Sequence, residues 1–300
     1  MQRKVYNVKL FDYKHGSQVR VYNKPISRII KDRDDLDTRA YEIDPDGQVK
    51  IKDPIKKKKK SLQKQKDPLD SSGRSSPLED LPEERERSLE NSKNRTKQKI
   101  YECCRSNEWE WFCTFTFNPD LIDRHDYKKV SAAMSRWLNE IKKKYCPDLK
   151  YILIPEAHKD GAVHFHGLFS NTGDLIFVES GVSFRNKDGD RCKIYNLVQF
   201  YLGFSNMTKV YHPERITSYI CKYITKDLVL LTENNKRYWI SRNLEKPNII
   251  EYNLKPDELD EMYVDISESV LHIKEQHIQD TINNRVFNKI TYIELRGSDE

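Results

Sequence analysis

The chain has 300 residues, a formal net charge of +6 and a pI of about 8.8, and 33% of its residues are charged. No apolar run approaches the roughly 20 residues that a membrane-spanning helix needs, which excludes a helical membrane protein. The basic excess and the 17 tyrosines fit a nucleic-acid partner, although ordinary soluble proteins share this composition.

The first residues and the cysteines predict an intracellular protein. The start, Met1 to Tyr6, does not resemble a signal peptide. The six cysteines form no Cys-x-x-Cys pair and are expected to be reduced thiols. Cys113 and Cys221 are expected to be small packing residues. We therefore expect a cytoplasmic location in a host cell and no membrane partner.

The N-terminal third divides into two predicted segments. Residues 1–44 contain the β-like runs Val5–Tyr13 and Gln18–Tyr22 around a Lys-His-Gly turn, so an accessory β-hairpin is expected. Residues 45–95 follow as a charged, low-complexity linker that leads into a polar helix near Glu83.

The linker carries too few apolar residues to bury a core. Residues 45–76 are therefore expected to be disordered, which leaves this N-terminal extension partly without structure. Lys56 to Lys60 form a run of five lysines. This run would either add non-specific DNA affinity through counterion release or serve as a solvated tether.

Residues 96–245 show the clearest periodicity and are predicted to form one domain. The predicted strands are Trp109–Phe117, Tyr151–Pro155, Val163–Phe169, Phe204–Val210 and Arg237–Ser241, and the predicted helices are Asp126–Tyr145 and Arg215–Leu230. This pattern predicts an α+β fold with a central antiparallel β-sheet flanked by helices. Residues 246–300 are a C-terminal accessory segment, in which Tyr263–Ile273 and Phe287–Leu295 look β-like or mixed and are expected to pack against the N-terminal hairpin.

A β-hairpin in this domain gathers acidic and imidazole side chains. Its two apolar runs flank a central Asp-Gly, and residues two apart in a strand share a face, so His164 and His166 point the same way. A loop with an odd number of residues would place Glu156 opposite His166 and His158 opposite His164, all on one face. A two-residue loop would put Glu156 on the other face.

Two imidazoles and a carboxylate with open positions are typical of a divalent-metal site. We predict that Glu156, His164 and His166 hold the metal, and that His158 lies nearby as a supporting or alternative ligand. The donor set suits Mg²⁺, Mn²⁺ or Zn²⁺. Two exposed histidines on a strand are the alternative interpretation.

A second motif, Tyr219-x-x-Lys222-Tyr223-x-x-Lys226, lies in the predicted helix Arg215–Leu230. At 100° per residue, Tyr223 lies about +40°, Lys222 about −60° and Lys226 about −20° from Tyr219, so all four share a stripe. Ile220, Cys221, Ile224 and Leu228 fall on the remaining arc and are expected to be buried. Oxygen nucleophiles beside cations suit attack on a phosphodiester; a solvated Tyr/Lys face is the alternative.

The motif order resembles the HUH endonucleases that initiate rolling-circle replication of plasmids and single-stranded DNA phages and viruses. The resemblance covers roughly residues 96–245 and rests on an aromatic/Thr strand at Trp111–Pro119, the segment from Glu156 to His166, and the doubled Tyr-x-x-Lys. The doubled motif is similar to the two-tyrosine class. Relaxases carry the tyrosine ahead of the histidines, so the order here argues against them.

The resemblance implies an HUH endonuclease fold, which is RRM-like, and a role for each matched residue. Tyr219 and Tyr223 would be nucleophiles, Lys222 and Lys226 would contact phosphate, and the metal would be Mg²⁺ or Mn²⁺, as a phosphodiester substrate also argues. Three further residues are candidates for DNA contact: Thr114, Thr116 and Asn118. The reaction would be site-specific nicking and rejoining through a 5′-phosphotyrosine, with the order of attack by the two tyrosines left open.

Partners and alternatives follow from the same resemblance. The DNA would be single-stranded or supercoiled origin DNA, and the released 3′-OH would prime a host DNA polymerase. The chain contains no G-x-x-x-x-G-K-[ST] motif, so a host helicase or supercoiling would separate the strands without ATP hydrolysis by this chain. A transposase or mobilisation nuclease with the same chemistry, and a non-catalytic DNA-binding repressor, are the alternatives.

Overall fold

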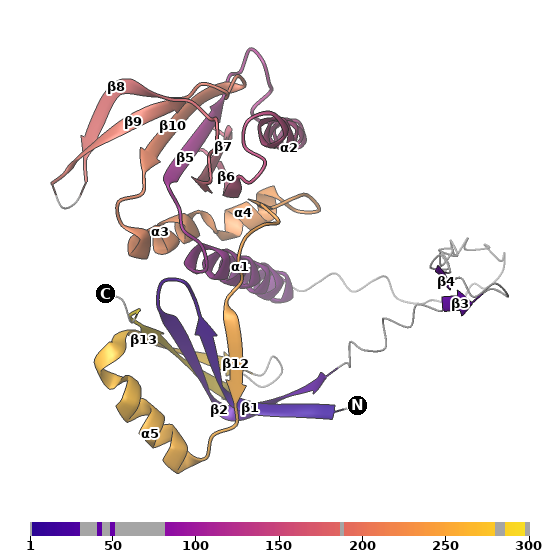
Figure 1. The fold of residues 1–300 in the computed structure, drawn as a ribbon, viewed down its shortest axis with the longest axis vertical. Helices are drawn as coiled ribbons and strands as arrows, with labels where there is room; N and C mark the ends of the chain where they lie inside the picture. The colour runs from indigo at the N-terminus through magenta and orange to yellow at the C-terminus, as the bar shows by residue number, and fades with distance from the viewer. Residues whose placement is uncertain are drawn as a thin grey trace.

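The computed structural model describes residues 2–30, 41–43, 49–51, 82–186, 189–279 and 286–297. The predicted fold class is confirmed, because the described residues form an α+β structure with antiparallel sheets and packed helices (Figure 1). Most of the predicted disordered stretch 45–76, including the lysine run, lies outside the described residues. Within that stretch, β4 (Val49–Ile51) pairs with β3 (Tyr41–Ile43).

The larger sheet has seven strands in the order β11-β6-β7-β5-β10-β9-β8. Its strands are β5 (Trp111–Phe117), β6 (Lys150–Ala157), β7 (Val163–Ser170), β8 (Phe177–Arg185), β9 (Arg191–Leu197), β10 (Gly203–Lys209) and β11 (Trp239–Ile240). All neighbouring strands in this sheet are antiparallel. The strand β8 was not predicted; its exposed residues give it no apolar run of the kind that marks a buried strand.

One face of this sheet packs on α2 (Tyr127–Lys144). Alternate residues of β5 are buried against this helix, and Trp137, Leu138 and Ile141 of the helix are almost fully buried in the same core. The side chain of Asp126 accepts hydrogen bonds from two backbone N–H groups of the first turn, which is why the helix begins there. This face is filled by hydrophobic packing and leaves the opposite face for polar side chains.

The opposite face is covered at β6, β7 and β5 by three helical segments and by α1 (Pro82–Arg105). The three segments are α3 (Pro213–Ile220), the 3₁₀ turn η2 (Cys221–Tyr223) and α4 (Lys226–Leu231). Ile100 and Cys104 of α1 are buried in this second core together with Ile220 and Leu228. The polar helix predicted near Glu83 is thus present, and it runs across residues 95 and 96.

The smaller sheet joins the two ends of the chain. Its strand order is β12-β1-β2-β14-β13, with β1 (Gln2–Asp12), β2 (Ser17–Ile30), β12 (Asn248–Tyr252), β13 (Val270–Gln279) and β14 (Val286–Leu295). The predicted hairpin is confirmed as β1–β2, and β14 pairs with β2, as expected for the C-terminal segment. Helix α5 (Pro256–Ile266) packs on one face of this sheet, where β-structure or a mixed pattern was expected.

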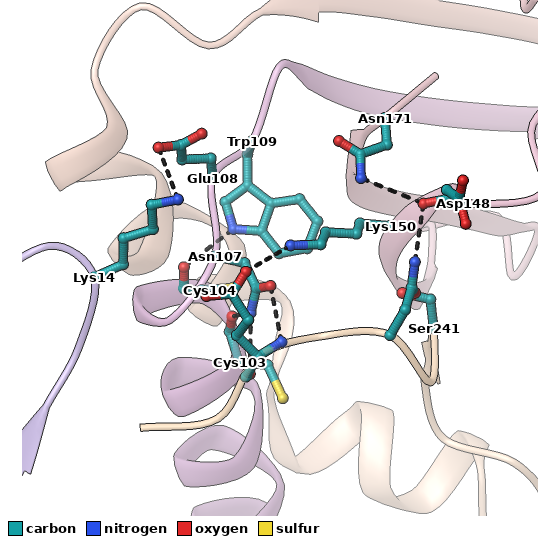
Figure 2. Close-up of polar contacts among 12 residues, drawn as sticks. Lys14, Cys103, Cys104, Asn107, Glu108, Trp109, Asp148, Lys150, Asn171 and Ser241 are labelled. Atoms are coloured by element: carbon teal, nitrogen blue, oxygen red, sulfur yellow. Dashed lines mark hydrogen bonds and ion pairs between the residues drawn. The ribbon is translucent and has the colours of Figure 1, made fainter. Parts of the chain in front are cut away.

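Helix α1 lies between the two sheets (Figure 1). The close-up in Figure 2 shows how its C-terminal end is fixed. The Asn107 amide donates to the Cys103 carbonyl at 2.9 Å, and the Trp109 indole donates to the Cys104 carbonyl at 3.1 Å. These bonds satisfy carbonyls that a helix end leaves without partners, so the turn into β5 has a defined geometry.

Two further expectations are met in the described residues. All six cysteines are free and buried, as expected for reduced packing residues. None of the helices in the described ranges combines the length and apolar character that crossing a bilayer requires.

Candidate functional site

The β6–β7 hairpin has the odd-numbered loop that the metal hypothesis requires, but its register differs from the predicted one. The loop is the five residues 158–162, and Glu156 pairs with His164. The predicted pairing of Glu156 with His166 and of His158 with His164 is therefore wrong by two positions. Because the shift is even, Glu156, His164 and His166 still share one face.

The loop closes early because its own hydrogen bonds favour a tight turn. The His158 N–H donates to the Ala162 carbonyl at 2.8 Å, and the Asp160 carboxylate accepts from the Ala162 N–H at 3.0 Å. Gly161 has φ +83°, which a residue with a side chain rarely adopts. These bonds remove His158 from the strand and leave its ring exposed, 5.1 Å from the His164 ring.

Glu156 and His166 meet diagonally across the hairpin. Their Oε2 and Nε2 atoms are 2.7 Å apart, and His166 is largely buried while Glu156 is partly exposed. Two ligands of one octahedral cation, each about 2.1 Å from it, lie about 3 Å apart, so this separation fits a shared ion. His164 stands directly opposite Glu156 on the same face.

Two threonines on β5 fix the imidazole rings. The Thr114 Oγ1 lies 3.1 Å from His166 Nδ1, and the Thr116 Oγ1 lies 3.0 Å from His164 Nδ1. Each ring therefore turns its Nε2 toward the Glu156 side. The alternation of threonine with buried aromatics on this strand was visible in the sequence, but the partners of the hydroxyls depend on the register between β5 and β7.

The surroundings keep the two imidazoles neutral. Burial lowers the pKa of His164 and of His166 below the ordinary value, although the nearby Glu156 carboxylate acts in the opposite direction on both. A neutral imidazole is the form that binds a metal ion. The site is thus poised for a cation rather than for a proton near neutral pH.

The predicted continuous helix Arg215–Leu230 is wrong, because the helix breaks between the second tyrosine and the second lysine. Ile224 has ψ 86°, and Thr225 has extended backbone while its Oγ1 accepts a hydrogen bond from the Leu228 N–H at 3.1 Å. Threonine is a favoured N-cap, so it starts a new helix instead of continuing the old one. The four apolar residues predicted to face inward are all buried: Ile220, Cys221, Ile224 and Leu228.

Both tyrosines lie against the histidine face. The Tyr223 ring stacks on the His166 ring with centroids 4.0 Å apart and an interplanar angle of 10°. The Tyr219 ring meets the Tyr223 ring edge-on at 5.9 Å, and its side chain is more exposed. Burial, followed by a hydrogen bond from Tyr219 and the Glu156 charge, raises the pKa of Tyr223 above the ordinary value.

Phe112 completes this contact and was not singled out from the sequence. Its ring lies 5.0 Å from the Tyr219 ring and 6.4 Å from the Tyr223 ring, and it is two residues before Thr114 on the same face of β5. One strand therefore supports both the tyrosines and the histidines. The period-two pattern Phe-x-Thr-x-Thr was the available signal.

The two lysines of the motif part from one another at the helix break. Lys222 is exposed, with its Nζ 5.1 Å from the centroid of the Tyr219 ring. Lys226 begins α4, and its Nζ lies 2.7 Å from a carboxylate oxygen of Glu86 on α1. The shared stripe is thus wrong for Lys226, which the break carries toward α1.

Asn118 lies just beyond β5 and shapes the turn that follows. Its side-chain oxygen accepts a hydrogen bond from the Asp120 N–H at 3.0 Å, and its carbonyl accepts from the Ile122 N–H. It is not in the cluster formed by the histidines and tyrosines. Its predicted DNA contact stays a prediction.

The donor set can be tested against a cation by its chemistry. Within the described residues, no three side chains from His, Cys, Asp and Glu already converge as a closed metal site. Two donor atoms do touch, and the His164 ring, held through Nδ1, presents its other nitrogen on the same face. A carboxylate and two neutral imidazoles fit a divalent cation with open positions.

Comparison with known proteins adds one finding. No curated protein and no solved structure matches the chain. Residues 110–228, which include every predicted site residue, match a family model of replication-associated proteins of the ORF2 type.

Proposed function

We propose that this chain is a rolling-circle replication initiator that nicks and rejoins DNA through a tyrosine nucleophile, at a site formed by Glu156, His164, His166, Tyr219 and Tyr223. The observation that carries the proposal is the stacking of Tyr223 on His166, whose Nε2 lies 2.7 Å from Glu156. A phenol and a set of metal donors are thereby brought to one place. The match to a replication-associated family favours DNA as the substrate.

Glu156, His164 and His166 would hold Mg²⁺ or Mn²⁺, with His158 available beside them. Bound there, the cation would supply Lewis-acid polarisation of the scissile phosphate. The phenol oxygen of Tyr219 or Tyr223 forms a bond to phosphorus, and the bond from phosphorus to the 3′ oxygen breaks. The phenol proton passes to solvent, and the products are a 5′-phosphotyrosine and a free 3′-OH.

Lys222 supports this step electrostatically. Its ammonium group next to the Tyr219 ring favours the phenolate and the negative charge that develops on the phosphate. Lys226 would contribute only after release from Glu86. The released 3′-OH can prime a host polymerase, and the covalent bond retains the energy needed for rejoining without ATP.

Two tyrosines in edge contact offer two successive nucleophiles. While one holds the 5′ end, the second can attack a regenerated junction at the same phosphate position, since the two rings are only 5.9 Å apart. A transposase or mobilisation nuclease would use the same residues on element ends. A repressor without catalysis would not form a covalent product.

The direct test uses a 3′-fluorescein-labelled set of single-stranded oligonucleotides that tile the encoding gene and its flanking DNA. With Mn²⁺ we expect a covalent protein–DNA adduct on a denaturing gel, and peptide mass spectrometry should place the DNA on Tyr219 or Tyr223. EDTA should prevent the adduct, and ATP should not be required. An adduct on any other residue, or none with any oligonucleotide or with supercoiled plasmid carrying the same DNA, would contradict the proposal.

The threonines give a more graded prediction. Replacing both Thr114 and Thr116 by Val removes the hydrogen bonds to the two Nδ1 atoms while keeping the side-chain shape. Loss of such partners of metal ligands typically lowers affinity by about 10–100-fold, so we expect that loss for Mn²⁺ in a calorimetric titration. Thr208→Val, on the same sheet face opposite Phe112, is the matched control and should bind Mn²⁺ normally.

A further inference from the structure

A groove runs between α1 and the face of the smaller sheet that α5 leaves uncovered. Residues on α5 and the sheet's other face form the apolar core, including Val8, Val19 and Ile293. On the uncovered face, Arg20 pairs with Tyr292, which in turn pairs with Lys274, so these three side chains project together. The groove has a volume of about 850 Å³.

The lining of the groove is polar and carries excess positive charge. It contains five basic side chains and two acidic ones, a net formal charge of +3 with histidine neutral. The basic residues are Arg20, Arg95, Lys97, Lys99 and Lys274. They come from α1, β2 and β13, so the charge is spread along the groove rather than collected at one point.

The two acidic residues are already engaged at the bottom of the groove. Glu102 accepts a hydrogen bond from Gln98 at 2.6 Å and lies 3.8 Å from Arg20. Glu294 accepts a hydrogen bond from Gln18 at 2.5 Å and lies 3.7 Å from Arg105. The acids therefore hold the groove's polar floor together and neutralise only the cations nearest to them.

The remaining cations have no acidic partner in the part of the chain that the structure describes. Arg95, Lys97, Lys99 and Lys274 form no ion pair with any residue in those ranges. Unpaired cations spaced along a groove fit a ligand with repeated negative charges, because each phosphate that binds releases condensed counterions. A single small anion would use only one or two of them.

Aromatic rings and amides alternate with these cations. The Arg20 guanidinium lies over the Phe11 ring at 3.8 Å and near the Tyr292 ring at 5.4 Å. Asn91 and Asn94 of α1 also line the groove and can form hydrogen bonds with base edges. Cations interleaved with aromatic rings on a sheet are typical of proteins that bind single-stranded nucleic acid.

We propose that this groove binds single-stranded DNA at a place separate from the candidate nicking site. A duplex is disfavoured, since α1 faces the sheet across the groove and cannot enter a major groove from there. Another side of the same helix packs against the tyrosine segment through Cys104 and Cys221. DNA held in the groove would thus be anchored next to the nicking domain, although its binding does not require nicking.

The test measures binding of fluorescein-labelled dT30 by anisotropy at several salt concentrations. Arg95→Ala, Lys99→Ala and Lys274→Ala together should weaken binding at least 10-fold. They should also lower the slope of log affinity against log salt by about 2, since each lost phosphate contact contributes about 0.7 on a single strand. The matched control combines Lys143→Ala, Arg242→Ala and Lys246→Ala, which removes the same charge from exposed positions outside the groove.

Equal losses in the groove variant and the control would show that only net charge matters and would overturn the proposal. A second measurement needs no variant: dT30 should protect Lys99 and Lys274 from acetylation in the unmodified protein, while Lys143 and Lys246 stay reactive. If only a 30-base-pair duplex protects them, the single-strand assignment is wrong. Covalent adduct formation is scored separately, so a failure of the nicking proposal would leave this result intact.

Discussion

Replacing Tyr219 and Tyr223 together by Phe is expected to abolish the covalent protein–DNA adduct. Both phenol oxygens that can reach the scissile phosphate are then gone, and no other part of the proposed reaction can replace them. We expect a drop of about 10³-fold or more, the scale on which an enzyme loses activity with its nucleophile. Adduct yield on the cognate oligonucleotide measures this directly.

The double variant should retain its structure and its DNA affinity. Phenylalanine keeps the stacking of residue 223 on His166 and the contact of residue 219 with Phe112, so the packing at the site is unchanged. Either single replacement should leave part of the activity, because the other phenol remains 5.9 Å away in ring-to-ring distance. Tyr211→Phe, at an exposed tyrosine beyond β10, is the control. Persistence of the adduct in the double variant would disprove the nucleophile assignment.

Replacing Glu156 by Gln and His166 by Ala is expected to remove metal binding and nicking together. The two changes delete both donor atoms that now lie 2.7 Å apart. The loss of Mn²⁺ affinity should exceed the roughly 10–100-fold expected for the threonine variant, because ligands themselves are lost rather than their partners. Titration of Mn²⁺ by electron paramagnetic resonance measures binding without DNA.

The matched control for these ligands is His277→Ala, at an exposed histidine on β13. It should bind Mn²⁺ and form the adduct as the unmodified protein does. His158→Ala should have an intermediate or small effect, since the loop holds this ring outside the strand pairing. Unchanged Mn²⁺ affinity in the Glu156/His166 variant would show that the cation, if one is needed, binds elsewhere.

Local periodicity was sufficient to predict the elements whose burial depends on spacing alone. In α2, the apolar residues spaced three and four apart are the buried ones, and Asp126 caps the helix. In β5, strict alternation separates the buried aromatics from the face with Thr114 and Thr116. The shared face of Glu156, His164 and His166 also followed from parity, which any odd loop preserves.

The register of the hairpin and the break in the tyrosine helix depended on finer local competition. The loop could close over three or five residues, and hydrogen bonds of Asp160 and His158 selected five. Thr225 could continue a helix or cap the next one, and its hydroxyl bond to Leu228 selected the cap. Such choices differ by the energy of one or two hydrogen bonds, which periodicity does not register.

The sequence by itself determined the α+β class, the faces of the strong elements and the residues gathered at the candidate site. The tertiary structure alone decided that the chain's two ends build one sheet, that threonines orient the histidines, and that α1 borders a basic groove. These features join residues hundreds of positions apart or on separate strands. Their pairing is selected by packing and hydrogen bonding in the folded chain, and no local pattern encodes it.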